Sequence, residues 1–150
     1  MSKIIQIRLA NSADAGALAV LNQEFNESTL TSEEIESHLQ KGLHPEIVLI
    51  VEVDNRVVGF ACVIMMSSIC YPHPWAELIE LYIQPQFRRQ GLGRALVEES
   101  ERMARERSAT GMHLLTGVAN TAGQALYSAL GYTKQPDLSF QKWLKHEGDG

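Results

Sequence analysis

The chain has 150 residues, of which 45% are hydrophobic and 21% are charged, and its net charge is −5. This length suits one domain spanning residues 1–150, and the composition is that of an ordinary globular protein, which excludes the disordered and collagen-like classes. The acidic balance argues against general nucleic-acid binding, which needs a basic surface to displace counterions from phosphates.

The sequence carries no pattern typical of secretion, membrane insertion or metal binding. Arg8 and Asn11 interrupt the N-terminal apolar residues before they reach signal-peptide length, and no stretch approaches the roughly 20 apolar residues of a membrane span. Cys62 lies in an apolar run and Cys70 stands beside prolines, and neither belongs to a Cys/His cluster. We therefore expect a cytoplasmic protein without a membrane partner, a metal site or a disulfide.

The N-terminal part of the sequence predicts a strand followed by two helices. Residues 4–9 alternate apolar and polar side chains, as an edge strand does. Asn11 is a candidate N-cap for a first amphipathic helix, whose apolar face continues to Phe25. Thr31 opens a second, shorter helix, which we expect to end at Gly42.

The middle of the sequence predicts three strands. Residues 47–53 and 57–67 are rich in β-branched and apolar side chains, and the tight turn at residues 54–56 joins them as a hairpin. Two prolines make residues 71–74 a loop, because proline cannot donate a ladder hydrogen bond. A third long strand is expected over residues 75–84.

The C-terminal part alternates helices and strands. Residues 91–107 predict a helix, residues 112–118 a strand and residues 121–130 another helix. Residues 132–144 predict a final extended pair. The order of elements indicates an α/β or α+β domain, with a mixed central sheet of about six to seven strands flanked by about four helices.

The segment between the third long strand and the next helix is rich in arginine and glycine. The first backbone N–H groups of a helix have no internal partner and carry partial positive charge, so they form an anion site. Gly91 and Gly93 lack Cβ atoms and let a diphosphate approach the backbone. The alternative is a glycine-opened helix with solvated arginines. The residues expected to contact a diphosphate are Arg88, Arg89, Gln90, Gly91, Leu92, Gly93 and Arg94.

This segment resembles the signature [RQ]-x-x-G-x-[GA] of the GCN5-related N-acetyltransferases, which stands between a strand and a helix and here occupies residues 88–93. A second block, residues 120–132, is similar to the family's N-x-x-A-x-x-x-Y-x-x-x-G-[FY] segment. Gly123 stands where alanine is frequent, a departure that we take as minor. The resemblance covers essentially the whole chain. It implies the GNAT fold, acetyl-CoA as co-substrate without a metal, and transfer of the acetyl group to an amine.

The resemblance also implies roles for residues of this chain. Asn120 is expected to contact the pantetheine arm of CoA, and Tyr127 to protonate the leaving thiolate. A tyrosine with a pKa near 10 is a suitable acid for a thiol with a pKa of about 8.5. Packing within its helix is the alternative for Tyr127. The strand residues expected to bind the pantetheine arm through their backbone are Leu81, Tyr82 and Ile83.

Glu77 and Glu80 are the candidate bases that deprotonate the attacking amine. They lie three residues apart on the predicted strand, and a regular strand places such residues on opposite faces. Burial raises a carboxyl pKa toward the operating pH of a base. Each carboxylate could instead pair with an arginine or cap a loop, and a water chain could act as the base.

The sequence leaves the acceptor open. A small amine such as an aminoglycoside or a polyamine is the first hypothesis, a protein N-terminus or lysine is the second, and a non-catalytic CoA-binding module is the third. A peptide acceptor needs the loop 68–74 to be short or folded away, and its aromatic rings could contact a cation or pack over the sheet. Glu24, Glu27 and Glu33 could bind an amine or remain solvated. A homodimer is expected, and the apolar segment 138–144 could supply its contact by strand exchange.

Overall fold

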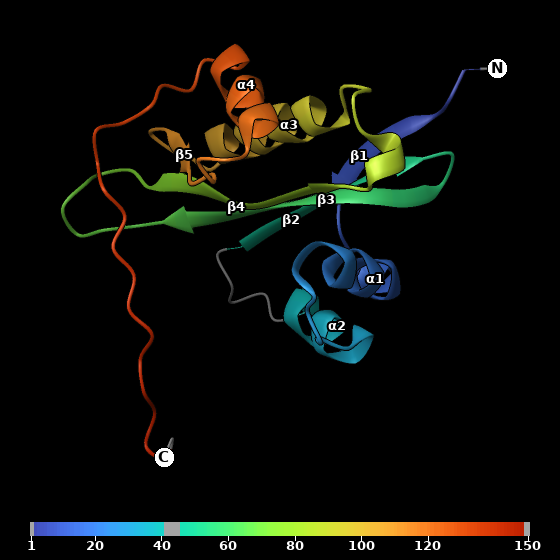
Figure 1. The fold of residues 1–150 in the computed structure, drawn as a ribbon, viewed down its shortest axis with the longest axis horizontal. Helices are drawn as coiled ribbons and strands as arrows, with labels where there is room; N and C mark the ends of the chain where they lie inside the picture. The colour runs from blue at the N-terminus through green and yellow to red at the C-terminus, as the bar shows by residue number, and fades with distance from the viewer. Residues whose placement is uncertain (1, 41–45, 149–150) are drawn as a thin grey trace.

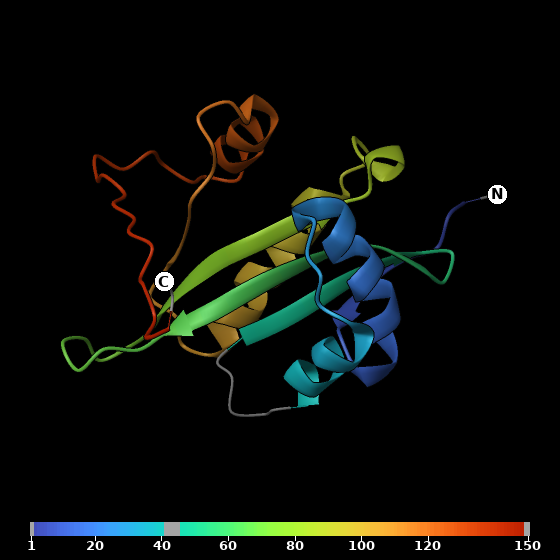
Figure 2. The same cartoon turned by 60° about the horizontal axis from the view of Figure 1, so that its bottom comes forward.

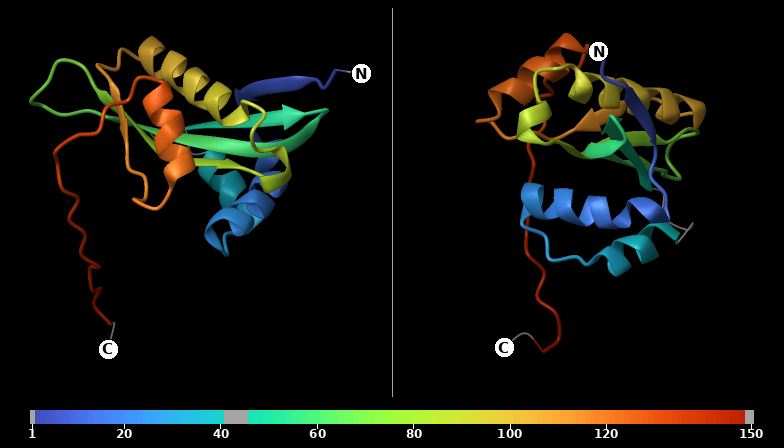
Figure 3. Two further views of the ribbon diagram at one scale, coloured as in Figure 1. Left: turned by 45° about the horizontal axis from the view of Figure 1, so that its top comes forward. Right: turned by 90° about the vertical axis from the view of Figure 1, so that its right-hand side faces the viewer.

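The computed structural model describes residues 2–40 and 46–148, and they form three layers. Figure 1 and the right panel of Figure 3 show α3 and α4 on one face of a central sheet and α1 and α2 on the other. The elements are β1 (Ile5–Leu9), η1 (Ser12–Asp14), α1 (Ala15–Asn26), α2 (Ser32–Gln40), β2 (Glu46–Val53), β3 (Arg56–Met66), β4 (Trp75–Ile83), η2 (Pro85–Phe87), α3 (Leu92–Glu106), β5 (Met112–Leu114) and α4 (Thr121–Ala129).

The sheet has five strands in the order β1-β2-β3-β4-β5. The first four are antiparallel, and β5 runs parallel to β4, so the predicted mixed α/β sheet and the predicted edge position of β1 are confirmed. The predicted count of six to seven strands is wrong, because residues 132–144 form no strand in the described part of the chain. The sequence pattern of these residues predicts an extended backbone, but a β-strand also needs a neighbouring strand to pair with. Gly42, the predicted end of the second helix, lies outside the described residues.

The predicted hairpin between β2 and β3 is confirmed. Its two turn residues, Asp54 and Asn55, both have left-handed backbone angles, with φ of 50° and 67°. Two left-handed residues match the right-handed twist of the flanking strands, and Asp and Asn tolerate this conformation better than other non-glycine residues. The turn therefore fixes the register of the two central strands β2 and β3.

The core lies on both faces of the sheet. On the α3 face the predicted apolar residues Leu92, Leu96 and Met103 are at most 7% exposed. On the α1 face, Leu18 and Leu21 pack against strand residues that include Phe60, Cys62 and Tyr82. Burying a leucine stabilises the fold by about 1.5–3 kcal/mol, so these contacts hold α3 and α1 in fixed positions against the sheet. No helix in residues 2–40 and 46–148 has the length and apolar content that crossing a membrane requires.

An ion-pair network ties β1 to the start of α1. The guanidinium of Arg8 donates to both carboxylate oxygens of Asp14, at 2.8 and 2.9 Å, and to Glu52 of β2 at 2.5 Å. Asp14 is 5% exposed and also accepts from the backbone N–H of Asn11 at 2.8 Å. Asn11 caps the short helix η1, which leads directly into α1, at the position where the sequence predicted a cap. The network therefore fixes the entry of the chain into the α1 layer.

Asp14→Asn should lower the free energy of unfolding by about 2 kcal/mol at neutral pH, because a paired and buried carboxylate is lost. The bonds from Arg8 and Asn11 hold the pKa of Asp14 below its usual value of 3.8. A lowered pKa stabilises the fold above the unfolded-state pKa, and this stabilisation is lost as the pH falls through the folded-state pKa. Urea unfolding at pH 7 and pH 3 should show a smaller effect of the substitution at pH 3. Asp137→Asn, on an exposed residue, is the control, and equal effects of both substitutions would contradict the assignment.

Candidate functional site

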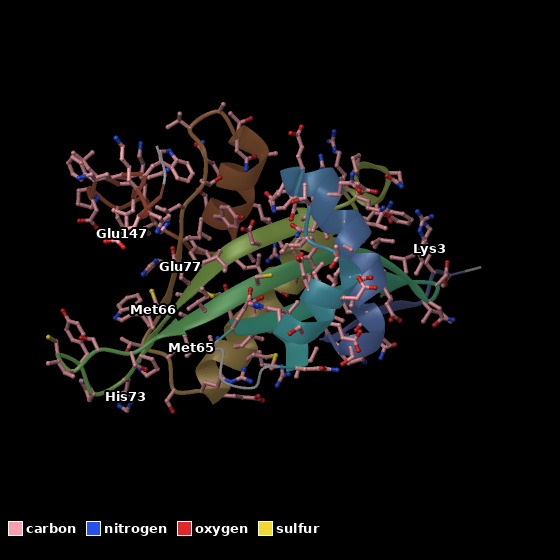
Figure 4. The ribbon with its side chains drawn as sticks, turned by 90° about the horizontal axis from the view of Figure 1, so that it is seen from below. Lys3, Met65, Met66, His73, Glu77 and Glu147 are labelled. Atoms are coloured by element: carbon pink, nitrogen blue, oxygen red, sulfur yellow. The ribbon has the colours of Figure 1, made fainter. Side chains whose placement is uncertain are left out.

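Strand β4 forms the floor of the candidate site and contains a β-bulge. The register with β3 shifts between Cys62 and Val63, which leaves Ile79 of β4 without a partner. The extra residue reverses the alternation of side chains, so Glu77 and Glu80 lie on the same face, toward α1 and α2. The prediction that they occupy opposite faces is therefore wrong. Figure 4, seen from the α1 and α2 side, locates Glu77 on β4 near the end of β3.

The two strands β4 and β5 pair over only three residues. Their parallel register runs from Ala76 opposite Met112 to Leu78 opposite Leu114. Beyond Leu78, β4 has no ladder partner on that side among the described residues, while its other edge stays paired with β3 as far as Ile83. The stretch 79–83, which contains the predicted pantetheine-binding residues, thus faces a split in the sheet. An extended ligand with amide groups can pair along such an edge as an added strand does.

The loop after β4 ends at the N-terminus of α3 with free backbone donors. Gly91 is the N-cap, and because glycine has no side chain, it provides no capping hydrogen bond to the first amides of the helix. Among the described residues, no protein group accepts a hydrogen bond from the N–H groups of residues 91–94, and the first bonded amide is that of Ala95, 3.0 Å from the Gly91 carbonyl. Left-handed backbone at Arg89 and Gly91 (φ 63° and 79°) curves the loop. A concave row of free amides at a helix N-terminus fits a diphosphate.

The arginines near this loop differ in what their side chains contact. Arg88 donates from Nε to the carbonyl of Ile83 at 2.8 Å, and its guanidinium lies 5.7 Å from the ring centroid of Tyr82. Arg94 pairs with Glu98 of its own helix at 2.9 Å. The side chain of Arg89 has no hydrogen bond or ion pair within the described ranges. Arg88 therefore attaches the loop to the end of β4, and its contact with a phosphate stays a prediction.

Asn120 is the N-cap of α4. Its side chain accepts from the N–H of Gly123 at 3.0 Å and donates to Thr116 at 3.1 Å. A Cβ atom at Gly123 would lie 2.4 Å from the Asn120 amide nitrogen, so any other residue there would require the Asn120 side chain to shift. The position that departs from the family pattern thus contacts the capping side chain. The predicted contact of Asn120 with the pantetheine arm stays a prediction.

Tyr127 lies on α4, above the sheet, and is half-buried. Its ring packs against the core on the α3 face and meets the ring of Tyr132 edge to face at 6.0 Å. Burial raises the pKa of Tyr127, which keeps the hydroxyl protonated at neutral pH. No group in the described part of the chain bonds this hydroxyl, so the packing of the ring and a proton-donating role of the hydroxyl are compatible.

The side chain of Glu80 projects from β4 on the α1 face of the sheet, opposite to the face that Tyr127 covers. Burial raises the pKa of its carboxyl, a hydrogen bond from Asn26 of α1 lowers it, and the charge of Glu46 raises it. Because Tyr127 faces the α3 layer and Glu80 faces α1, the structure does not bring the two side chains into contact. The sheet lies between them.

A hydrogen-bonded group that the sequence did not indicate joins α1 to the end of β4. Tyr82 donates to Glu24 at 2.9 Å, and Gln84 donates to the same carboxylate at 3.2 Å. Gln84 is 5% exposed, and its carbonyl oxygen has no partner among the described residues. The three helix glutamates singled out in the sequence are all exposed, but Glu24 differs from Glu27 and Glu33 because Tyr82 and Gln84 hold its carboxylate. These three residues come together only through the packing of α1 against the end of β4, so the sequence alone does not indicate the hydrogen bonds.

The loop 67–74 between β3 and β4 extends beyond the end of the sheet, away from α1 and α2 (Figures 1 and 2). Tyr71 is 65% exposed there. Trp75 at the start of β4 stacks on His113 at 5.9 Å and covers Gly111, so its ring packs over the sheet. The loop therefore leaves the α1 side of the candidate site uncovered.

Comparisons with known sequences agree with this geometry. The sequence model described as the acetyltransferase (GNAT) family matches residues 17–132. An aminoglycoside N(6')-acetyltransferase type 1 from Klebsiella aerogenes is 36% identical over 97 residues, which cover 63% of this chain and 64% of that protein. The chain spans less than two thirds of the length of the curated relatives that it matches.

Solved structures share the fold. The structure of an aminoglycoside N-acetyltransferase in complex with CoA matches with a TM-score of 0.82 at 19% identity, over 95% of this chain and 97% of that chain. A ribosomal-protein-alanine N-acetyltransferase from Brucella melitensis matches with a TM-score of 0.78 at 20% identity, over 93% and 100% of the two chains. At these identities the likeness concerns the fold alone.

Gly91 and Gly93 provide a matched test of the loop geometry. Gly91→Ala should destabilise the protein by about 1–2 kcal/mol, because its φ of +79° is strained for alanine. Gly93→Ala should stabilise it by up to about 1 kcal/mol, because the residue is helical and a Cβ there meets only a side-chain methyl of Leu126 at 3.7 Å. Urea unfolding of the two variants measures both changes. Shifts of the same sign would show that the loop has another conformation.

Proposed function

Because the chain belongs to the acetyltransferase (GNAT) family, we propose that it transfers the acetyl group of acetyl-CoA to a primary amine, most readily that of a small molecule, by direct attack on the thioester. The observation that carries this proposal is the row of free amides at residues 91–94, next to the unpaired edge of β4 at residues 79–83. CoA has two matching parts, a diphosphate and an extended arm that contains amides.

In this proposal the two proton transfers take place on opposite faces of the sheet. Glu80, on the α1 side, takes a proton from the acceptor ammonium, and the free amine attacks the thioester carbon. The C–S bond then breaks, and the thiolate takes the proton of the Tyr127 hydroxyl from the α3 side. The nitrogen, which carries one extra proton after the attack, loses it to solvent, and the Tyr127 phenolate takes up a proton from solvent. The products are the acetylated amine and CoA with a free thiol. The raised pKa of Glu80 brings this carboxyl closer to the operating pH of a base, and the raised pKa of Tyr127 keeps its hydroxyl protonated and so able to donate.

The charge of the acceptor side supports a cationic acceptor. Glu24, Glu46, Glu77 and Glu80 all belong to α1 or to the sheet face that α1 covers, and within residues 2–40 and 46–148 none of them forms an ion pair with a lysine or an arginine. A small amine is the first acceptor class, in keeping with the name of the Klebsiella relative. A peptide amine is the second, and the uncovered α1 side supports it, because the loop 67–74 extends away and leaves room for a chain.

The remaining expectations form part of the same proposal. We retain a cytoplasmic location, a homodimer, and the absence of a metal, a nucleic-acid partner and a membrane partner. The net charge of −5 supports the absence of a nucleic-acid partner. Exposed apolar residues near the C-terminus support the homodimer.

Release of free thiol from acetyl-CoA, measured with a panel of small amines and a panel of peptides, tests the proposed function. Turnover with small amines is the expected result. Turnover with peptides alone would establish the second acceptor class. Binding of acetyl-CoA by calorimetry without turnover on either panel would show a non-catalytic CoA-binding module and overturn the proposal.

Tyr127→Phe should lower kcat by about 100-fold, because the thiolate loses its proton donor. The KM for acetyl-CoA should change little, since phenylalanine keeps the packing of the ring. Tyr132→Phe is the control, because it removes a similar hydroxyl, hydrogen-bonded to Glu101 at 2.9 Å. Steady-state kinetics with both substrates measures the two effects, and an unchanged kcat in Tyr127→Phe would remove the acid role.

Glu80→Gln should remove the acidic limb of the pH–rate profile. The base works when it is deprotonated, so the rate of the parent enzyme should fall as the pH drops through the raised pKa of Glu80. The variant should be slow at every pH and should lack this limb. Glu77→Gln is the matched control on the same face of β4 and should keep the limb. The opposite pattern would assign the base to Glu77.

A further inference from the structure

One carboxylate attaches the last turn of α1 to the end of β4. Figure 2 shows the C-terminal end of α1 next to the point where β4 leads into the loop before α3. The Glu24 carboxylate there accepts a hydrogen bond from the Tyr82 hydroxyl at 2.9 Å and from the Gln84 side-chain amide at 3.2 Å. Hydrogen bonds to an ionised acceptor are stronger than those between neutral groups. Glu24 therefore holds two side chains at the end of β4 from the α1 layer.

Both oxygens of this carboxylate are already hydrogen-bonded. One accepts from Gln84 at 3.2 Å, and the other accepts from Tyr82 at 2.9 Å and from Gln84 at 3.3 Å. In the described part of the chain the carbonyl oxygen of Gln84 has no partner, so Glu24 is the group that fixes the orientation of this buried amide. This arrangement suits a residue that positions other side chains better than one that binds a ligand directly.

Tyr82 extends this connection to the loop before α3. It is 6% exposed, and its ring lies 5.0 Å from the ring of Phe25. The guanidinium of Arg88 lies over the same ring, 5.7 Å from the centroid, while its Nε donates to the Ile83 carbonyl at 2.8 Å. The face of an aromatic ring attracts a cation, and a carboxylate that accepts the phenolic hydrogen bond polarises the ring further. Glu24 and Arg88 thus contact the same tyrosine, one at its hydroxyl and the other at its ring.

The contacts of Arg88 leave the outer end of its side chain available. Its two Nη groups make no hydrogen bond or ion pair with the residues that the structure describes. They belong to the loop that ends at the free amides of residues 91–94. A guanidinium whose orientation is already fixed loses less rotamer freedom when its forked donors bind a phosphate. The affinity of this loop for a diphosphate should therefore depend on how Tyr82 holds Arg88.

We propose that Glu24 is a positioning residue for the cofactor: Glu24 fixes Tyr82, Tyr82 orients Arg88, and Arg88 binds the diphosphate of CoA. This inference rests on the proposed function, because it requires CoA at the loop. Glu24 lies on α1, the helix of the proposed acceptor side, so the same contacts couple the two substrate sides. Coupling between two sites is reciprocal, so CoA bound at Arg88 also stabilises the last turn of α1.

Calorimetric titration with CoA tests the path from Glu24 to Arg88 through a double-mutant cycle. Arg88→Ala should weaken CoA binding about tenfold, because a charged hydrogen-bond donor to the diphosphate is lost. Glu24→Ala should weaken it about fivefold, although removal of a negative charge by itself favours an anionic ligand. The double variant should bind CoA no more weakly than Arg88→Ala alone, because Glu24 acts only through Arg88.

Three further variants separate the hydrogen bond from the charge. Glu24→Gln should keep the affinity within about twofold of the parent, because an amide oxygen still accepts from Tyr82. Tyr82→Phe removes the same hydrogen bond from the other partner and keeps the ring, so it should weaken CoA binding as Glu24→Ala does and provides the test if Glu24→Ala does not fold. Glu36→Ala removes an exposed carboxylate from α2 and is the control for charge, so it should not weaken binding.

The outcomes distinguish this inference from the proposed function. CoA binding by the parent with an unchanged affinity in Glu24→Ala, or additive losses in the double variant, would overturn the inference alone. A higher KM for the amine in Glu24→Ala with an unchanged affinity for CoA would overturn it in favour of direct contact between Glu24 and the acceptor. A parent that binds no CoA would overturn the proposed function and the inference together.

Hydrogen exchange at the Arg88 side chain gives a readout that needs no CoA. The Nε–H proton of Arg88 should exchange with solvent at least about tenfold faster in Glu24→Ala than in the parent, because the guanidinium is no longer held against the Ile83 carbonyl. The rate in Glu24→Gln should equal that of the parent. Equal rates in the parent and in Glu24→Ala would show that Arg88 is oriented without Glu24 and would overturn the inference, whether or not CoA binds.

Discussion

The early end of the ladder between β4 and β5 is the constraint on which the candidate site depends. Unpaired backbone groups inside a sheet cost about 1–3 kcal/mol each when water cannot reach them. The unpaired stretch 79–83 is therefore stable only where solvent or a ligand fills the split. The bulge at Ile79 lies at the point where the ladder ends, and a bulge bends its strand and increases its twist. The same irregularity opens the split and turns Glu77 and Glu80 to one face.

The proposed anion site at the start of α3 depends on the core as much as on its own residues. Leu92, Leu96 and Val97 are at most 3% exposed and fix the helix against the sheet. With the helix held in place, the free amides at residues 91–94 lie at the end of β4, where the split also ends. Left-handed backbone at Arg89, uncommon for a residue with a side chain, is maintained next to this site. Packing thus places the two parts of the proposed CoA-binding surface side by side.

The sequence predicted some parts of the site and could not predict others. The loop at residues 88–93 follows from a local pattern. The common face of Glu77 and Glu80 was missed, because a bulge adds a residue without leaving a mark in the sequence. The link of Glu24 to Tyr82 and Gln84 was also missed, since it joins residues 58 and 60 positions apart. An extended pair was expected over residues 132–144, because an apolar alternating pattern does not reveal whether a partner strand is available.

By itself, the sequence determined the hairpin turn at Asp54 and Asn55, the apolar faces of the helices and the free amides of the α3 start. Each of these depends on backbone angles and spacings set within a few residues. Only the tertiary structure decided where the β4–β5 ladder ends, which side chains face the split from each side, and that residues 133–148 lie away from their own sheet. These features depend on register and packing between distant segments, where the free energy of a contact is shared by residues that no local pattern connects.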